Sequence, residues 1–261
     1  MRWLPALVLP LVVLAGCNGS GDEGEPSPPG IRVSPEQPRD RAPAVTLRPD
    51  EPLAGKTVVL DPGHQLGNGR FPSEINRLVD AGGLMKPCNT TGTATDAGYP
   101  EATFVWEVAE VLQRKLERWG AEVVLTRDSN SAELWGPCVD ERGRRAAEGD
   151  LLVSIHGDGN LSPGARGFHV IASPEVEGSQ ALAEEMRDGL VAEGLETSTY
   201  LGSEGLDSRT DLGTLNLAVR PAVMVELGNM RDPQDAALMT SPEGRQRYAA
   251  GLLRGIRRHL R

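Results

Sequence analysis

The chain has 261 residues, which is long enough for one sizeable domain with accessory segments. Hydrophobic residues make up 39% of it and aromatic residues only 4%, so the core must consist mainly of aliphatic side chains. The formal net charge of −10 argues against a nucleic-acid partner, because nucleic acids bind basic faces. The same charge argues against electrostatic adhesion to an anionic membrane surface.

Residues 1–16 are predicted to be a targeting segment rather than part of a fold. Arg2 precedes an apolar run over residues 3–14, which is shorter than the roughly 20 residues of a membrane-spanning helix. The run ends in residues 14–17, LAGC. This tetrapeptide resembles the signal of bacterial lipoproteins, which implies that Cys17 is lipidated and anchors an exported protein to a membrane. The alternative is an ordinary secretory peptide that happens to contain a cysteine.

Residues 17–50 then form the lipidated cysteine and a linker. Glycine, serine and acidic residues fill positions 18–25, and seven prolines follow between Pro26 and Pro49. No apolar period recurs there, so we expect a disordered, semi-extended tether. Residues 51–261 are predicted to be the folded domain.

The cysteine count favours a disulfide in that domain. The three cysteines are Cys17, Cys88 and Cys138. If Cys17 is lipidated, the other two are an even pair in an exported protein. Closing such a loop stabilises a fold by about 2–4 kcal/mol in the chain-entropy account. Two separate buried thiols are the alternative, and no CxxC spacing indicates a cysteine metal site.

Strand and helix patterns alternate after residue 55. Residues 57–60 are rich in β-branched side chains, whereas apolar residues recur at helical spacing between positions 104 and 116. The segment 65–100 is long, polar and Gly-rich, and such loops are usually functional or held in place. The alternation predicts a single α/β domain with a mainly parallel, twisted sheet flanked by helices. The expected strands are 57–60, 122–126, 151–156, 167–172 and 222–226, and the expected helices are 101–119, 139–148, 174–193 and 241–261.

Three of these strands end in residues that bind metals or carry protons. His64 follows the first strand after an Asp-Pro-Gly turn, His156 closes the third strand and Glu226 closes the fifth. Functional side chains collect at the carboxyl ends of strands in open α/β sheets, so we expect these three to converge. Two imidazoles with a carboxylate make an open zinc site. Glu101, at the start of a helix, could supply the third ligand, which would leave Glu226 free to act as the general base.

These residues also have plainer interpretations. His64 could cap its own turn, and His156 could be a satisfied core histidine. Glu226 resists this interpretation, because an acid directly after a buried strand is costly to bury without a purpose. Asp61 either caps the turn or orients His64. His169 either lines the groove or is an ordinary strand residue.

The strand ends carry a resemblance to a known family. Residues 59–64 (VLDPGH), 154–156 (SIH) and 221–228 (PAVMVELG) occur in the order of three signature blocks. The blocks resemble those of the zinc-dependent N-acetylmuramoyl-L-alanine amidases of the amidase_3 type. The resemblance covers about residues 55–260 and implies one zinc ion per domain.

The resemblance also implies a role for each matching residue. His64 and His156 match the two zinc-binding histidines, and Glu226 matches the catalytic glutamate. Glu101 matches the ligand glutamate that begins the helix after the first strand. Glu74 is the rival third ligand, because it lies nearer to His64 in the sequence. We prefer Glu101, because a helix N-terminus holds a ligand rigidly and a loop does not.

Two further features match particular members of the family. Cys88 and the segment 136–142 (GPCVDER) resemble mycobacterial and actinobacterial members, in which the two cysteines pair. Arg142 resembles an arginine of the family pattern, and it either holds substrate carboxylates or forms a salt bridge with an acidic neighbour. The pair Gln65 and Leu66 departs from the pattern of many members, at the rim of the groove rather than at the metal.

We therefore expect a lipid-anchored, monomeric peptidoglycan hydrolase that faces the cell wall or periplasm. Its predicted reaction is cleavage of the amide between N-acetylmuramic acid and L-alanine by a zinc-activated water. A zinc peptidase acting on stem-peptide bonds is the alternative among enzymes. A non-catalytic wall-binding lipoprotein is the alternative outside enzymes, although such proteins usually lose a ligand or the base.

Overall fold

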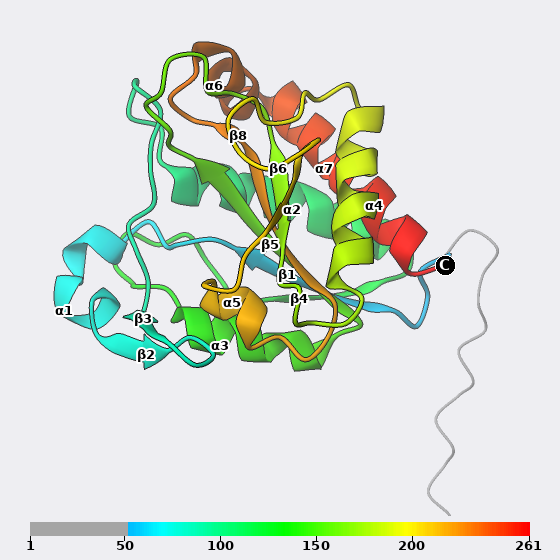
Figure 1. Cartoon of the computed structure of the whole chain (residues 1–261), viewed down its shortest axis with the longest axis horizontal. Helices are drawn as coiled ribbons and strands as arrows, with labels where there is room; N and C mark the ends of the chain where they lie inside the picture. Colours follow the sequence, from blue (N-terminus) through cyan, green and yellow to red (C-terminus); the bar gives the residue numbers. More distant parts are fainter. Residues whose placement is uncertain (1–51) are drawn as a thin grey trace, which may run out of the picture. The chain divides into compact units, whose positions relative to one another are not determined.

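The computed structural model describes residues 52–261, so the predicted signal segment, the lipidation site at Cys17 and the linker lie outside the described residues (Figure 1). The main sheet has six strands, β1 (Thr57–Pro62), β4 (Glu122–Leu125), β5 (Leu151–Asp158), β6 (His169–Ala172), β7 (Leu206–Ser208) and β8 (Ala222–Asn229).

The strand order is β4-β1-β5-β8-β6-β7. β1 pairs in parallel with β4 and β5, and β5 pairs in parallel with β8. β6 runs antiparallel to β8 and parallel to β7. The predicted α/β class with a mainly parallel sheet is confirmed, and β1, β5 and β8 lie side by side with their carboxyl ends at one edge.

Helices cover both faces of the sheet (Figure 1). Residues of α2 (Glu101–Arg118), α4 (Ser179–Ala192) and α7 (Pro242–His259) form the larger core, whereas η2 (Arg145–Glu148) and α5 (Gly213–Asn216) contribute to the smaller one. Successive side chains of a strand point to opposite faces, so Val58 and Leu60 enter the larger core while Val59 enters the smaller one. Within residues 52–261, no helix combines the length and the apolarity needed to cross a membrane.

The expected elements are present, with differences at their ends. The helix predicted from position 174 begins at Ser179, because Gly178 before it has a left-handed φ of +79°. The helix predicted over 139–148 divides into α3 (Val139–Arg144) and η2. The final helix starts as predicted, with the Ser241 hydroxyl accepting a hydrogen bond from the Gly244 N–H at 3.0 Å.

One helix was not predicted. α6 (Pro233–Thr240) follows β8 after a short turn. Its signal is local, because Asp232 caps the helix by accepting hydrogen bonds from two backbone N–H groups, and a proline occupies the first helical position. The helix is short and its apolar pattern is weak, which is why periodicity alone does not predict it.

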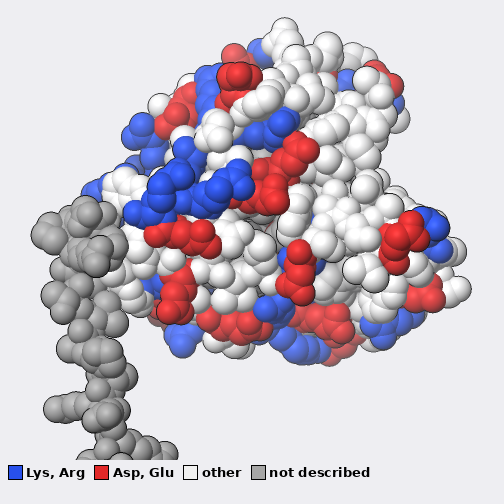
Figure 2. Space-filling model, turned by 180° about the vertical axis from the view of Figure 1, so that it is seen from behind, with Lys and Arg blue, Asp and Glu red and all other residues white. Residues whose placement is uncertain are grey.

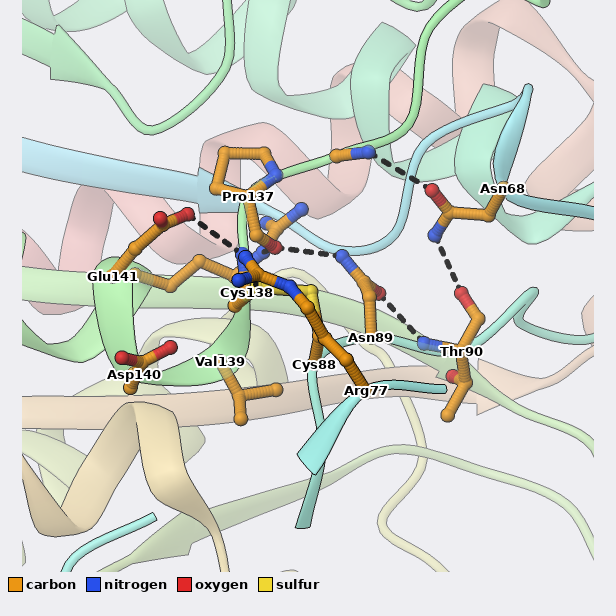
Figure 3. Close-up of a disulfide and its surroundings, with 12 residues drawn as sticks. Asn68, Arg77, Cys88, Asn89, Thr90, Pro137, Cys138, Val139, Asp140 and Glu141 are labelled. Atoms are coloured by element: carbon orange, nitrogen blue, oxygen red, sulfur yellow. Dashed lines mark hydrogen bonds between the residues drawn. A yellow bond between two sulfur atoms is a disulfide. The ribbon is translucent and has the colours of Figure 1, made fainter. Parts of the chain in front are cut away.

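The segment 65–100, expected to be a loop, contains η1 (Asn68–Arg70), α1 (Pro72–Ile75) and a hairpin of β2 (Leu78–Asp80) and β3 (Met85–Pro87). Cys88 follows the hairpin and forms a disulfide with Cys138, the N-cap of α3 (Figure 3). Beside it, Asn89 Nδ2 donates to the Pro137 carbonyl at 2.7 Å. The predicted pairing is confirmed, and it ties the segment to α3.

Charges of both signs are intermixed on the face seen in Figure 2. Ion pairs also join neighbouring helices, and Arg254–Glu193 and Arg258–Asp188 connect α7 with α4. Exposed pairs of this kind contribute little stability. They show that the basic residues of α7 are partly neutralised by acids of α4.

Candidate active site

A sharp turn after β1 directs His64 toward the neighbouring strand. Gly63 donates its N–H to the Ile155 carbonyl at 3.0 Å. A Cβ atom at Gly63 would lie 2.2 Å from Cε1 of His156, so only glycine fits between the two histidines. His64 itself has φ +57°, a left-handed conformation that is uncommon for a residue with a side chain. Such a conformation persists only where the surroundings enforce it.

Asp61 and Arg142 provide part of this enforcement. The buried carboxylate of Asp61 accepts hydrogen bonds from Arg142 Nη1 at 2.5 Å, Ser154 Oγ at 2.6 Å and Thr126 Oγ1 at 2.5 Å. Arg142 also donates to the Pro62 carbonyl at 3.0 Å and to the His64 carbonyl at 2.7 Å. Burial by itself would raise the pKa of Asp61, but Arg142 and the two hydroxyls lower it below its ordinary value.

Arg142 therefore forms the ion pair that was one of its two predicted roles. Its Nε donates to the Pro137 carbonyl at 2.9 Å, so each of its three nitrogens has an acceptor within the protein. The side chain is 3% exposed and borders the cavity described below. This arrangement makes Arg142 a residue that positions the turn.

Arg127 is a further residue of the site and was not predicted. It links the turn to the helix that carries Glu101. It donates to the Pro62 carbonyl at 2.9 Å, the Gly63 carbonyl at 3.3 Å and the Ala102 carbonyl at 3.0 Å. Burial and the charge of Arg142 lower the pKa of Arg127 to about 9. Its position in the sequence could have identified Arg127 as a site residue, because it follows β4 and therefore lies at the same edge of the sheet as the strand ends above.

The His64, Glu101 and His156 side chains converge on one point. Glu101 Oε1 lies 3.0 Å from His64 Nε2 and 3.0 Å from His156 Nδ1. The ligand atoms of the three residues all lie within 4.8 Å of one another. Glu101 is held by the Gly157 N–H on Oε1 at 3.2 Å and by the Thr93 N–H on Oε2 at 2.9 Å.

This donor set fits a zinc ion. His64 Nδ1 lies 3.1 Å from the Thr90 carbonyl, and donating a proton there leaves Nε2 with a lone pair facing Glu101. A lone pair and a carboxylate oxygen 3.0 Å apart need a proton or a cation between them. Two imidazole nitrogens and one carboxylate oxygen are ligands that zinc accepts, with a further position open to water.

The charges of the three groups depend on one another in the metal-free protein. Burial opposes ionisation of Glu101, but the two histidines outweigh it and lower the pKa of Glu101. Burial lowers the pKa of His64, yet Glu101 and the Thr90 carbonyl raise it overall. The pKa of His156 is lowered, chiefly by burial. A metal ion held by this cluster would therefore compete with a proton for the His64 position.

Glu226 lies beside this cluster on β8. It pairs in register with His156 across the β5–β8 ladder, and both side chains border the same cavity. Its Oε2 atom is buried and has no hydrogen-bond partner among residues 52–261. Burial and the nearby carboxylates of Glu101 and Asp158 raise the pKa of Glu226 well above its ordinary value. A carboxyl group with such a pKa can take up a proton and return it.

Two residues weighed as alternatives lie elsewhere. Glu74 is on α1 and is not part of the cluster of ligand atoms. His169 is opposite Glu226 in the β6–β8 ladder, but it is 1% exposed and does not border the cavity. Its Nδ1 also lacks a partner in the described part of the chain.

The cluster and Glu226 open into a cavity of about 580 Å³. Its walls come from the hairpin residues 85–87, the segments 89–93 and 211–214, and the carboxyl ends of β5 and β8. An α/β domain with this cavity at the carboxyl edge of its sheet, and with two histidines and a glutamate that could hold a metal ion beside a second glutamate, is an arrangement suited to a hydrolase.

Comparison with known proteins identifies the family. Residues 58–258 match the model of the Amidase_3 family, described as N-acetylmuramoyl-L-alanine amidase. The chain belongs to this family. It is 45% identical over 213 residues to the N-acetylmuramoyl-L-alanine amidase Rv3717 of Mycobacterium tuberculosis, covering 78% of this chain and 86% of that one.

Two solved structures are similar as well. The N-acetylmuramyl-L-alanine amidase Ami1 of Mycobacterium smegmatis has 44% identity and a TM-score of 0.75, over 80% of this chain and 98% of that one. The apo form of Ami1 of Mycobacterium abscessus has 45% identity and a TM-score of 0.75, over 80% of this chain and 100% of that one.

Proposed function

We propose that this protein is a zinc-dependent N-acetylmuramoyl-L-alanine amidase of the cell wall. Its reaction is hydrolysis of the amide bond between N-acetylmuramic acid and the L-alanine of the peptidoglycan stem peptide. The observation that carries the proposal is the convergence of His64, Glu101 and His156 beside Glu226 at one cavity. Family membership and the activity named for the mycobacterial relatives support the same bond.

The three converging residues would hold the metal and Glu226 would move the protons. A zinc ion bound there supplies a Lewis acid and favours the ionisation of water. Glu226 accepts a proton from the attacking water and later donates it to the departing amine of L-alanine. Its raised pKa suits both steps, because the protonated carboxyl must form easily and must also lose its proton again.

The buried arginines keep the ligands in place during this cycle. Arg142 holds the turn that carries His64, and Arg127 holds both that turn and the first turn of α2. Rigid ligands reduce the reorganisation that accompanies charge movement in the site.

The proposed setting is the outer side of a membrane. Peptidoglycan lies outside the cytoplasmic membrane, which agrees with an exported chain. We propose that Cys17 is lipidated, that residues 18–50 act as the tether and that the domain works as a monomer. Replacing Cys17 by alanine should release the protein from membranes, and continued tight association would count against lipidation.

Digestion of purified peptidoglycan tests the proposed reaction. The mature chain without its lipidation site (residues 18–261) should release stem peptides with a free N-terminal L-alanine. A chelator should stop the release and added zinc should restore it. New N-termini within the stem peptide would favour the peptidase alternative, and no release at all would favour the wall-binding alternative.

A further inference from the structure

A second charged cluster lies at the hairpin side of the cavity. Lys86 on β3 donates from Nζ to Asp211 Oδ2 at 2.8 Å. Arg209, just after β7, donates to the same carboxylate from Nε at 2.8 Å and from Nη2 at 2.9 Å. These hydrogen bonds hold the pKa of Asp211 well below its ordinary value. The three residues, called the cationic triad below, therefore carry a net charge of +1.

The cationic triad lies at the edge of the cavity that Glu226 borders. Lys86 and Asp211 both border that cavity. Burial and the carboxylates near Glu226 raise its pKa, and the guanidinium of Arg209 acts in the opposite direction.

Lys86 and Arg209 have N–H groups that donate to no acceptor in the described chain. The Lys86 ammonium has three N–H groups and one acceptor, Asp211, within the described chain. Nη1 of Arg209 donates to no group among residues 52–261. The Lys86 and Arg209 side chains are 33% and 41% exposed. By contrast, Arg142, the other cation at the cavity, has an acceptor for each of its nitrogens.

Part of the cavity wall is apolar and aliphatic. Met85, Val139, Leu212 and Met224 border the cavity, and no Phe, Tyr or Trp of the described chain does. Such a wall fits the methyl group of L-alanine, followed by a short peptide. Beyond L-alanine, the second residue of the stem peptide carries a carboxyl group outside the peptide chain, and so does a third residue that is diaminopimelate. Each of these is either free or amidated.

We propose that Lys86 and Arg209 form a subsite for a free carboxylate of the stem peptide. The subsite rests on the proposed amidase function and names the part of the substrate that binds at this end of the cavity. Charge-assisted hydrogen bonds from the ammonium and the guanidinium recognise a carboxylate and discriminate against an uncharged amide. The carboxylate-binding role considered for Arg142 thus belongs to Lys86 and Arg209.

Three synthetic muramoyl-tripeptides test the subsite on the 18–261 chain. One has free carboxyl groups on the second and third residues, one is amidated only on the second, and one only on the third. We expect one of the two amidations to lower kcat/KM by about 10- to 100-fold, mainly by raising KM, because it removes a hydrogen bond between charged groups. The position of that amidation identifies the carboxylate that binds.

Lys86→Gln and Arg209→Gln should each remove most of this preference by weakening cleavage of the free-acid substrate. Lys56→Gln, next to the amino end of β1 and away from the cavity, is the matched control and should keep the preference. Equal cleavage of all three substrates by the unaltered protein would overturn the subsite, and so would a preference that survives both cavity variants. If no substrate is cleaved, the amidase function itself fails, and the subsite with it.

Discussion

The two sides of the cavity differ in how completely their polar atoms are paired. On the ligand side, formed by His64, Glu101 and His156, each residue has partners within the protein. On the base side, formed by Glu226, the buried Oε2 atom has no partner in the described part of the chain. Unpaired buried polar atoms are costly and are uncommon in folded proteins.

The difference agrees with the roles that we propose for the two sides. Metal ligands must stay at fixed distances, so backbone and arginine donors hold the ligand side in a single geometry. A general base must exchange protons with water and substrate, so an atom already paired within the protein would be less available. We therefore expect the buried, unpaired carboxyl group of Glu226 to lower the stability of the fold in exchange for reactivity.

The largest expected effect is on the base side. Glu226→Gln should lower kcat by about 10²- to 10⁴-fold, because the variant cannot accept a proton. Zinc content measured by mass spectrometry should stay at one ion per chain. Glu74→Gln, a glutamate outside the cluster, is the control and should keep full activity. Loss of zinc from Glu226→Gln would instead place Glu226 among the ligands.

The same variant should be more stable than the unaltered protein when both are metal-free at neutral pH. Folding raises the pKa of Glu226, so the penalty on folding begins once the pH exceeds the ordinary pKa of the carboxyl group in the unfolded chain. The penalty grows until the pH reaches the raised pKa, and it fades as the pH falls. Thermal unfolding in the presence of chelator measures the difference. A lower Tm for Glu226→Gln would show that the buried carboxylate of Glu226 does not destabilise the fold.

On the ligand side, Arg142→Met should lower the free energy of unfolding by about 3–5 kcal/mol, because it leaves the buried Asp61 carboxylate without its counterion. Arg144→Met, on the same helix but 56% exposed, should change it by less than about 0.5 kcal/mol. Denaturant titration of the metal-free proteins measures both values. Equal, small losses would show that Arg142 does not hold the turn.

Removing the disulfide should have a smaller effect on stability. Cys88→Ser combined with Cys138→Ser should lower the free energy of unfolding by about 2–4 kcal/mol, because the unfolded chain gains freedom. Activity should fall less than in Glu226→Gln, since neither cysteine borders the cavity. An unchanged unfolding midpoint under oxidising conditions would show that the segment 65–100 is held by its other contacts.

The smallest effect concerns proton competition on the ligand side. The pKa of His64 is raised in the metal-free protein, and zinc must displace its proton, so affinity should decline as the pH falls below that pKa. The decline should approach about tenfold per pH unit for one displaced proton. Competition with a chromophoric chelator between pH 5 and 8 measures it. Glu226→Gln should show the same slope, because it alters only the base side.

The site could be predicted to a large extent because its residues occupy strand ends. A strand of aliphatic residues followed by a histidine or a glutamate is a local pattern, and parallel strands bring such ends to one edge. The start of α2 at Glu101 and the cap at Ser241 are local patterns as well. The hairpin β2–β3 and helix α6 were missed because short elements lack a detectable period.

The sequence by itself determined the fold class, the candidate ligands and base, and the two cysteines that pair. Only the tertiary structure decided which basic side chains are fully hydrogen-bonded within the described chain and which have N–H groups left to bind a ligand. Arg142 and Lys86 are both basic residues bordering the cavity, yet one has its nitrogens paired within the protein and the other keeps free donors. The physical reason is that hydrogen-bond saturation depends on contacts between residues far apart in the chain, as when Arg127 joins β1 to α2.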